Sequence, residues 1–88
     1  MLYMLGAARD KKVVYQWEID IIKNWRTDEI KNRIWMAKEL GHATPGCVSI
    51  EAMRVELIRR GEQPNGYHEN EDIDMSNIEI ERVYRRGR

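Results

Sequence analysis

Hydrophobic and polar positions alternate with a period of two over residues 12–22. Apolar side chains fill every odd position from 13 to 21, and the even positions are mainly polar, except for Val14 and Ile22. The apolar residues at the odd positions are Val13, Tyr15, Trp17, Ile19 and Ile21. Alternating β-branched and aromatic residues are typical of a strand with one buried face. We therefore interpret residues 12–22 as a strand.

A helix extending to Trp25 is the alternative for the same segment. A helical wheel places Val14, Trp17, Ile21 and Trp25 on one arc, but Glu18 falls inside that arc. If the segment is a strand, residues 1–5 are its expected hairpin partner, with residues 6–11 as the connecting loop.

The pattern changes to helical spacing at Thr27. Thr27 is a suitable N-cap, two acidic residues follow it, and Gly41 supplies a C-terminal stop. These signals predict a helix over residues 28–40. Its apolar side is expected to contain Ile30, Ile34, Met36, Ala37 and Leu40.

A second helix is predicted over residues 49–60, from Ser49 as N-cap to a stop at Gly61. Its buried stripe is expected to contain Ile50, Met53 and Leu57. In the loop between the helices, Pro45 followed by Gly46 is the signature of a type II turn.

The last part of the chain has turn and strand signals. Residues 68–74 hold four acids and are expected to be a solvated loop, while residues 78–84 alternate like a final strand. The predicted order is β-β-α-α-β over a single domain of residues 1–84, followed by a frayed basic tail, 85–88.

The expected fold is thus α+β, with two helices packed on a three-stranded antiparallel sheet. The alternative, if residues 12–25 are helical, is a three-helix core with a C-terminal hairpin, resembling a winged helix in its arrangement.

Composition narrows the class of function. The chain has 88 residues, with 15 basic and 15 acidic side chains and a formal charge of zero, so no overall field attracts nucleic acid or an anionic membrane. A domain of this size lacks room for a deep pocket, which disfavours a small-molecule substrate. No apolar run is long enough to span a bilayer, and Cys47 is the single cysteine. We expect a soluble cytoplasmic protein.

Motifs for catalysis, metals and cofactors are missing from the sequence. His42, Cys47 and His68 lack the spacing of a zinc site or of a cysteine nucleophile. Asn70, Asp72, Asp74 and Glu81 match four positions of a calcium loop, but Met75 occupies the position that needs glycine. No glycine-rich phosphate loop is present. We expect neither an enzyme nor a cofactor.

Trp35 marks a candidate contact surface. On the wheel of helix 28–40 it projects away from the apolar side, between Lys31 and Lys38. A tryptophan on a polar face is either covered by another segment of the chain or used to anchor a partner. We expect a partner-binding surface made of Trp35, Lys31 and Lys38.

Helix 49–60 offers a second candidate surface. Val55 projects away from the buried stripe on the side of Arg59, and Arg54 lies at the edge of the core with its charged head directed outward. Val55, Arg54 and Arg59 are therefore added to the expected partner-binding residues.

Two helices joined by a loop also suggest a helix-turn-helix DNA-binding protein. In this alternative, helix 49–60 enters the major groove and the basic tail contacts phosphates. The DNA-binding residues would be Arg54, Arg59, Arg60, Arg85 and Arg86. The long connecting loop and Glu51 near the helix start count against it.

The sequence therefore favours a small non-catalytic protein-binding or regulatory module that acts through an exposed helix face. Its partner is expected to be another protein or a second copy of the chain, bound through the helix faces. A further possibility is that the domain mainly forms a homodimer by edge pairing of the first or last strand. DNA binding is the alternative.

Overall fold

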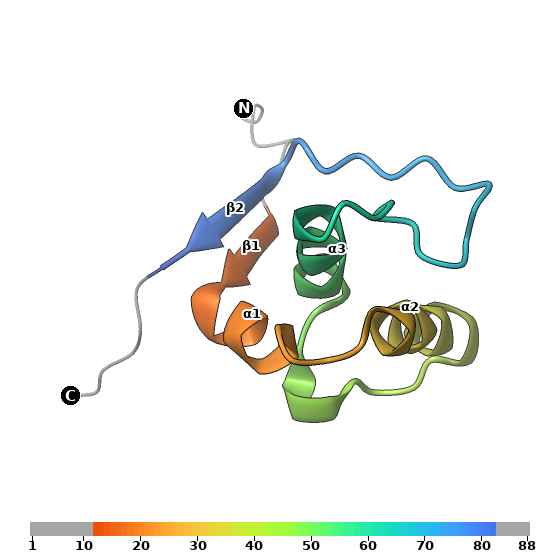
Figure 1. Cartoon of the computed structure of the whole chain (residues 1–88), viewed down its shortest axis with the longest axis horizontal. Helices are drawn as coiled ribbons and strands as arrows, with labels where there is room; N and C mark the ends of the chain where they lie inside the picture. Colours follow the sequence, from red (N-terminus) through yellow and green to blue (C-terminus); the bar gives the residue numbers. More distant parts are fainter. Residues whose placement is uncertain (1–11, 83–88) are drawn as a thin grey trace, which may run out of the picture.

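The computed structural model describes residues 12–82 (Figure 1). The expected partner strand 1–5, its loop 6–11 and the basic tail 85–88 lie outside the described residues, as do residues 83 and 84.

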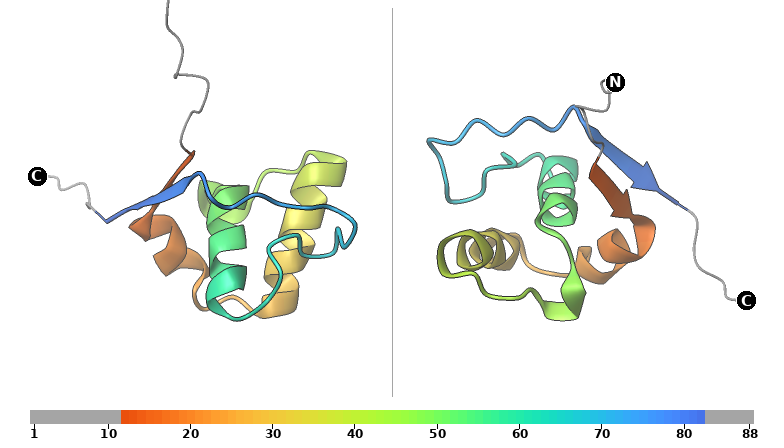
Figure 2. Two further views of the ribbon diagram at one scale, coloured as in Figure 1. Left: turned by 90° about the horizontal axis from the view of Figure 1, so that it is seen from above. Right: turned by 180° about the vertical axis from the view of Figure 1, so that it is seen from behind.

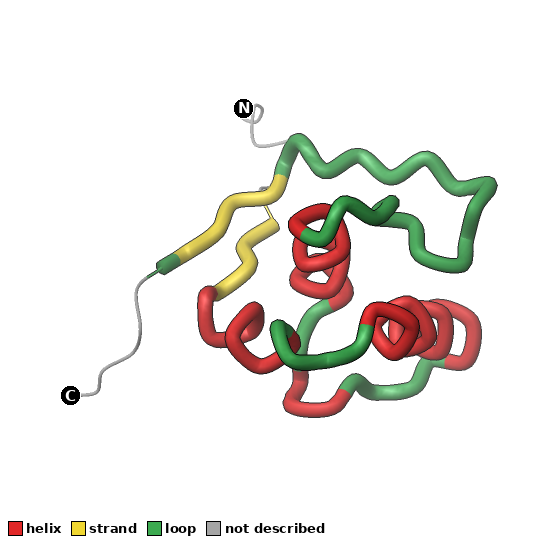
Figure 3. Tube along the Cα trace, in the orientation of Figure 1, coloured by secondary structure: helices red, strands yellow, loops and turns green. Residues whose placement is uncertain are grey.

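Within the described residues, three α-helices pack beside a two-stranded parallel sheet (Figures 1 and 3). Short π-helical and 3-10 segments follow the second helix. In chain order the elements are β1 (Lys12–Tyr15), α1 (Gln16–Ile22), α2 (Thr27–Trp35), the π-helical segment Met36–Leu40, the 3-10 segment Pro45–Cys47, α3 (Ile50–Arg59) and β2 (Ile78–Glu81). The expectation of two helices on a three-stranded antiparallel sheet was wrong.

The first and last elements of the described chain form the sheet. Lys12 pairs with Ile78 and Tyr15 with Glu81, in parallel register. A parallel pair needs a long crossover, which the three helices and the loop after them supply. The alternative fold had the correct number of helices, but residues 12–82 contain no C-terminal hairpin: β2 is the one strand that follows α3 there, and it pairs with β1.

Residues 12–22 are a short strand followed at once by a helix, so the single-strand interpretation was wrong. The chain changes from a period of two to a period of 3.6 at Gln16, and this turns Val14 and Ile22 toward the core. Val13, Tyr15, Trp17 and Ile21, expected on the buried face, are exposed instead. Tyr15 and Trp17 stack with ring centroids 6.4 Å apart.

Glu18 explains how the helix begins inside this apolar segment. Its Oε2 accepts a hydrogen bond from the backbone N–H of Tyr15 at 2.9 Å, and its Oε1 accepts one from the N–H of Ser49 at 2.8 Å. The buried carboxylate therefore satisfies a free backbone donor at the start of α1 and another at the start of α3.

The helix predicted over 28–40 is α2 with its π-helical continuation. It begins one residue earlier, with Arg26 as the N-cap, so the prediction of Thr27 as the cap was wrong. Gly41 has φ 70° and ends the element, as predicted. Ile30 and Ile34 are buried, but Leu40 is 53% exposed. A π-helical turn contains more residues than an α-turn, so it rotates the last apolar positions away from the core.

α3 is the central helix, packed against α1, α2 and β1 (Figure 2). Ser49 caps it as predicted, because its Oγ accepts a hydrogen bond from the N–H of Ala52. The preceding turn is also confirmed: Gly46 has φ 68°, and the N–H of Cys47 donates to the carbonyl of Thr44. The fully buried core draws on every helix and on β1, and consists of Val14, Ile22, Ile30, Ile34, Ala52, Met53 and Leu57, with Val48 nearly as buried.

Candidate docking groove

A groove of about 400 Å³ lies between α1, α3 and β2. Its apolar lining comes from all three elements, as Ile19, Val55, Ile58 and Ile80. Polar side chains complete the lining: Gln16, Glu56, Arg59 and Arg82. Among these, Ile58 is 44% exposed and Ile80 is 38% exposed, so a substantial aliphatic surface is in contact with solvent.

The register of the sheet places Ile80 in the groove. Val14 is buried and pairs with Ile80, so Ile80 and Ile78 lie on the inner face of the sheet. Ile78 packs against the core. Ile80, two residues further along β2, lies beyond the core and lines the groove instead.

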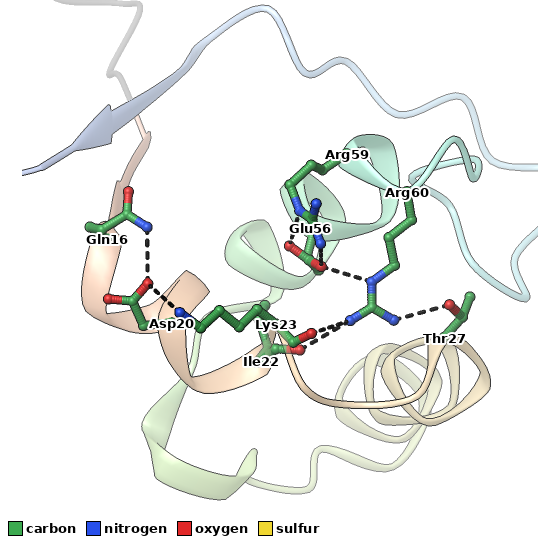
Figure 4. Close-up of polar contacts among 8 residues, drawn as sticks. All are labelled: Gln16, Asp20, Ile22, Lys23, Thr27, Glu56, Arg59 and Arg60. Carbon is green, nitrogen blue, oxygen red and sulfur yellow. Dashed lines mark hydrogen bonds and ion pairs between the residues drawn. The ribbon is translucent and has the colours of Figure 1, made fainter.

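Two charged residues of the groove lining, Glu56 and Arg59, belong to a cluster that Arg60 completes (Figure 4). The carboxylate of Glu56 is fully buried and accepts hydrogen bonds from two arginines. Arg59 donates to it through Nε at 2.9 Å and Nη2 at 2.6 Å, and Arg60 donates through Nε at 2.7 Å.

The two arginines keep Glu56 charged inside the protein. Burial is the largest single influence and acts to raise the pKa of Glu56, but the hydrogen bonds and charges of Arg59 and Arg60 together outweigh it. The net effect is that the pKa of Glu56 is lowered below its ordinary value.

Arg60 also ties all three helices together (Figure 4). Its Nη2 donates to the carbonyls of Ile22 and Lys23 at the end of α1, and its Nη1 donates to Oγ1 of Thr27 at the start of α2. These bonds satisfy carbonyl groups that a helix C-terminus leaves without intrahelical partners. Arg60, expected on the DNA-contacting surface, thus serves the fold.

The first predicted surface, around Trp35, is crossed by the loop after α3. Lys31 pairs with Glu62 at 2.9 Å and lies over the ring of Tyr67, and Lys38 pairs with Glu71 at 2.6 Å. The indole of Trp35 remains 39% exposed. Both lysines that were expected to flank a partner are therefore bound to the loop of the same chain.

The second predicted surface is divided by the structure. Arg54 is 6% exposed and its Nη1 donates to the carbonyl of Pro64 at 2.9 Å, so it holds the loop after α3. Val55 and Arg59 instead both line the groove. Arg85 and Arg86 lie outside the described residues.

Sequence reasoning missed six groove residues: Gln16, Ile19, Glu56, Ile58, Ile80 and Arg82. The sequence predicts both Ile19 and Ile80 in strands, but Ile19 lies in α1 and only Ile80 in a strand. The predicted antiparallel sheet therefore could not place both of them next to Val55. The alternation of Ile78 and Ile80 with acids was the available signal, because it indicates a strand with one apolar face.

Two side chains expected not to form a metal or nucleophile site, His68 and Cys47, have other surroundings in the structure. His68 Nε2 lies 2.8 Å from Oε2 of Glu39, and Cys47 is an exposed free thiol. Within residues 12–82, no group of three or more His, Cys, Asp or Glu side chains is arranged to hold a metal ion.

Comparison with known protein families, with characterised proteins and with solved structures gives no match to this chain. No helix within residues 12–82 has the length and apolar character needed to cross a membrane. The function is therefore argued from the groove itself.

Proposed function

We propose that this protein is a small non-catalytic module that binds another protein through the groove between α1, α3 and β2. The observation that carries the proposal is the exposed aliphatic lining, drawn from three elements and flanked by polar residues. Concave apolar surfaces with a polar rim mark places where a partner's apolar side chains are buried.

The size of the groove limits the kind of partner. A groove of about 400 Å³ accepts a few side chains, which suits a short segment of a partner better than the broad face of a folded domain. Two further depressions among the described residues are lined mainly by charged and polar residues of α2 and of the loop after α3. They offer little apolar area to drive association.

Charge at the rim favours an acidic segment. The side chain of Arg59 is 62% exposed although it pairs with Glu56, and Arg82 is exposed at the end of β2. A carboxylate placed between them would gain from both charges, and its contribution would weaken as salt is added.

The DNA-binding alternative receives less support. It needs a helix whose arginines face outward, and only Arg59 of the three on helix 49–60 has an exposed side chain. Arg54 and Arg60 hold the loop and the other helices. An affinity for duplex DNA that stays constant between low and moderate salt would argue against DNA binding directly.

The test uses a display library of random twelve-residue peptides selected against the full chain. Binders are then measured against Ile58→Asp, which places a charge in the groove, and against Leu40→Asp as a matched control on the π-helical segment. We expect Ile58→Asp to weaken binding by about tenfold or more, equivalent to about 1.4 kcal/mol, and Leu40→Asp to leave it unchanged.

Circular dichroism and urea unfolding of both variants show whether the fold is retained. Binders that are equally affected by both substitutions, or by neither, would contradict docking in the groove.

A further inference from the structure

The outer edge of β2 is open within the described residues. Lys12 donates its N–H to the carbonyl of Asn77, and the parallel register then directs the N–H and C=O groups of Glu79 and Glu81 toward β1. Alternation directs the N–H and C=O groups of Ile78 and Ile80 away from β1. In residues 12–82 no backbone hydrogen bond is made to them on that side.

The other edge of the sheet is differently placed. The N–H of Tyr15 points away from β2 and is already bound to the carboxylate of Glu18, where the chain turns into α1. β2 lies at the margin of the molecule in every view (Figures 1 and 2). Of the two strands, β2 therefore offers the accessible edge.

The sheet is also small for its type. Parallel sheets are usually covered on both faces, and two strands alone are marginal in water. A further strand beside β2 would supply the missing backbone hydrogen bonds.

We propose that the partner segment binds as an extended strand along the free edge of β2, with its inward side chains in the groove. This inference rests on the proposed function and specifies how the same site is used. Strand addition of this kind obtains affinity from main-chain hydrogen bonds and specificity from alternate side chains.

The chemistry of the site determines the sequence pattern of the segment. Inward positions next to Ile80 and Ile58 favour apolar side chains, and an inward carboxylate at the end of the strand fits Arg59 and Arg82. Outward positions lie beside Glu79 and Glu81, which occupy the outer face of β2, so acids are disfavoured there.

A second copy of the chain fits this edge poorly. Antiparallel pairing of two β2 strands with their inner faces on the same side places Glu79 opposite Glu79 or Glu81 of the other copy in two of the three possible registers. The third register, with Glu79 opposite Asn77, needs the N–H of Ser76, which already donates to Oδ1 of Asp74. Like charges directly opposite each other destabilise a strand pair. We therefore assign the edge to a different protein.

The probe is a seven-residue peptide. It has glutamate at positions one and seven, threonine at positions two and six, valine at positions three and five, and lysine at position four. The control peptide has its third and fourth residues exchanged, which moves a valine to the outer face. Both are titrated into the full chain, labelled with ¹⁵N. We expect the first peptide alone to shift the amide resonances of Ile78 and Ile80 and to slow their hydrogen exchange.

Amide exchange in the free protein decides whether the edge is open. Glu79 and Glu81 serve as internal controls, because their amides bond to β1. If the amides of Ile78 and Ile80 are as protected as these in the free protein, the edge is already occupied and the proposal is overturned. Sedimentation then shows whether a second copy is the occupant.

N-methylation of the peptide distinguishes strand addition from other modes. Only alternate residues of an added strand bond to β2, so methylating one alternate set of amides should abolish binding and methylating the other should leave it intact. If methylating either set of amides abolishes binding, or if neither does, strand addition is overturned.

Two substitutions at one position test the protein side. Ile80→Pro removes the outward N–H and the side chain, while Ile80→Ala removes only the side chain; neither removes a bond to β1. We expect the affinity for the peptide to fall by about tenfold more with Ile80→Pro than with Ile80→Ala. Equal effects overturn the inference.

The same variants distinguish a failure of strand addition from a failure of the proposed function. If selected peptides lose affinity with Ile58→Asp while Ile80→Pro and Ile80→Ala act alike, the groove binds a partner without strand addition. If Ile58→Asp has no effect on them, the proposed function fails as well.

Discussion

Oε1 of Glu18 accepts a hydrogen bond at 2.8 Å from the N–H of Ser49, which lies 31 residues further along the chain. The other carboxylate oxygen accepts the N–H of Tyr15. One buried side chain therefore joins the beginnings of α1 and α3, where backbone donors have no partner within their own helices.

Replacing Glu18 with alanine should destabilise the protein more than most single substitutions. It leaves two backbone donors without an acceptor, and we expect a loss of about 2–4 kcal/mol in the free energy of unfolding. Glu18→Gln retains one acceptor oxygen and should lose less. Urea unfolding measures both, with Glu29→Ala as a control in the first turn of α2. Equal stability of Glu18→Ala and the control would contradict this role.

We expect Arg60 to stabilise the folded protein and not to contact a partner. Arg60→Ala removes its bonds to α1 and α2 and leaves Glu56 with one partner, so we expect a loss of about 2–4 kcal/mol on unfolding. Arg60→Lys keeps the charge but not the branched guanidinium, and should restore only part of the loss. Thermal and urea unfolding provide the measurement. Full stability in Arg60→Ala would show that the clamp is dispensable.

The buried Glu56 should make stability depend on acid pH. Its pKa is lower in the folded protein than in the unfolded chain, where it is near 4.5, so the folded state is favoured above that value. This stabilisation is lost as the pH falls through the folded pKa.

Urea unfolding of the wild type and of Glu56→Gln from pH 7 down to pH 3 tests this. We expect the wild type to be the more stable at pH 7 and its advantage to shrink as the carboxylate is protonated. An advantage that stays constant over this range would contradict the proposed charge cluster.

The contact between Lys38 and Glu71 should be visible as a titration. A hydrogen bond from Lys38 is the leading cause that lowers the pKa of Glu71, and the charges of Lys38, His68 and Arg54 act in the same direction. In Lys38→Ala the carboxyl carbon of Glu71 should titrate at higher pH than in the wild type, as followed by NMR. Lys23→Ala is the control, because Lys23 pairs with Asp20. An unchanged titration would show that the loop is held in another way.

Local signals in the sequence located several features correctly. Ser49 as an N-cap, Gly41 as a helix stop and the turn at Gly46 depend on neighbouring residues, and all three are confirmed. Such features follow from backbone geometry and short-range hydrogen bonds, so a single sequence contains the information that sets them.

Residues 12–22 show where local reasoning fails. The two residues that broke the alternation, Val14 and Ile22, are the buried ones, and the regular positions are largely exposed. Glu18 looked like an obstacle to a helix because its partner, the N–H of Ser49, is remote in sequence. Whether a carboxylate can be buried depends on donors that only the folded chain brings to it.

In the groove, too, local sequence patterns determine some features and the tertiary structure decides the others. The sequence by itself determined that Val55 and Arg59 share a side of their helix, because helical spacing is local. Only the tertiary structure placed Ile19 and Ile80 beside them and turned Arg54 and Arg60 to internal carbonyl groups. For Ile80 the physical reason is the parallel pairing of β1 with β2, which joins the two ends of the described chain. For the arginines it is the position of carbonyl groups on other segments. Contacts between segments that are distant in the chain leave no periodic signal in the sequence.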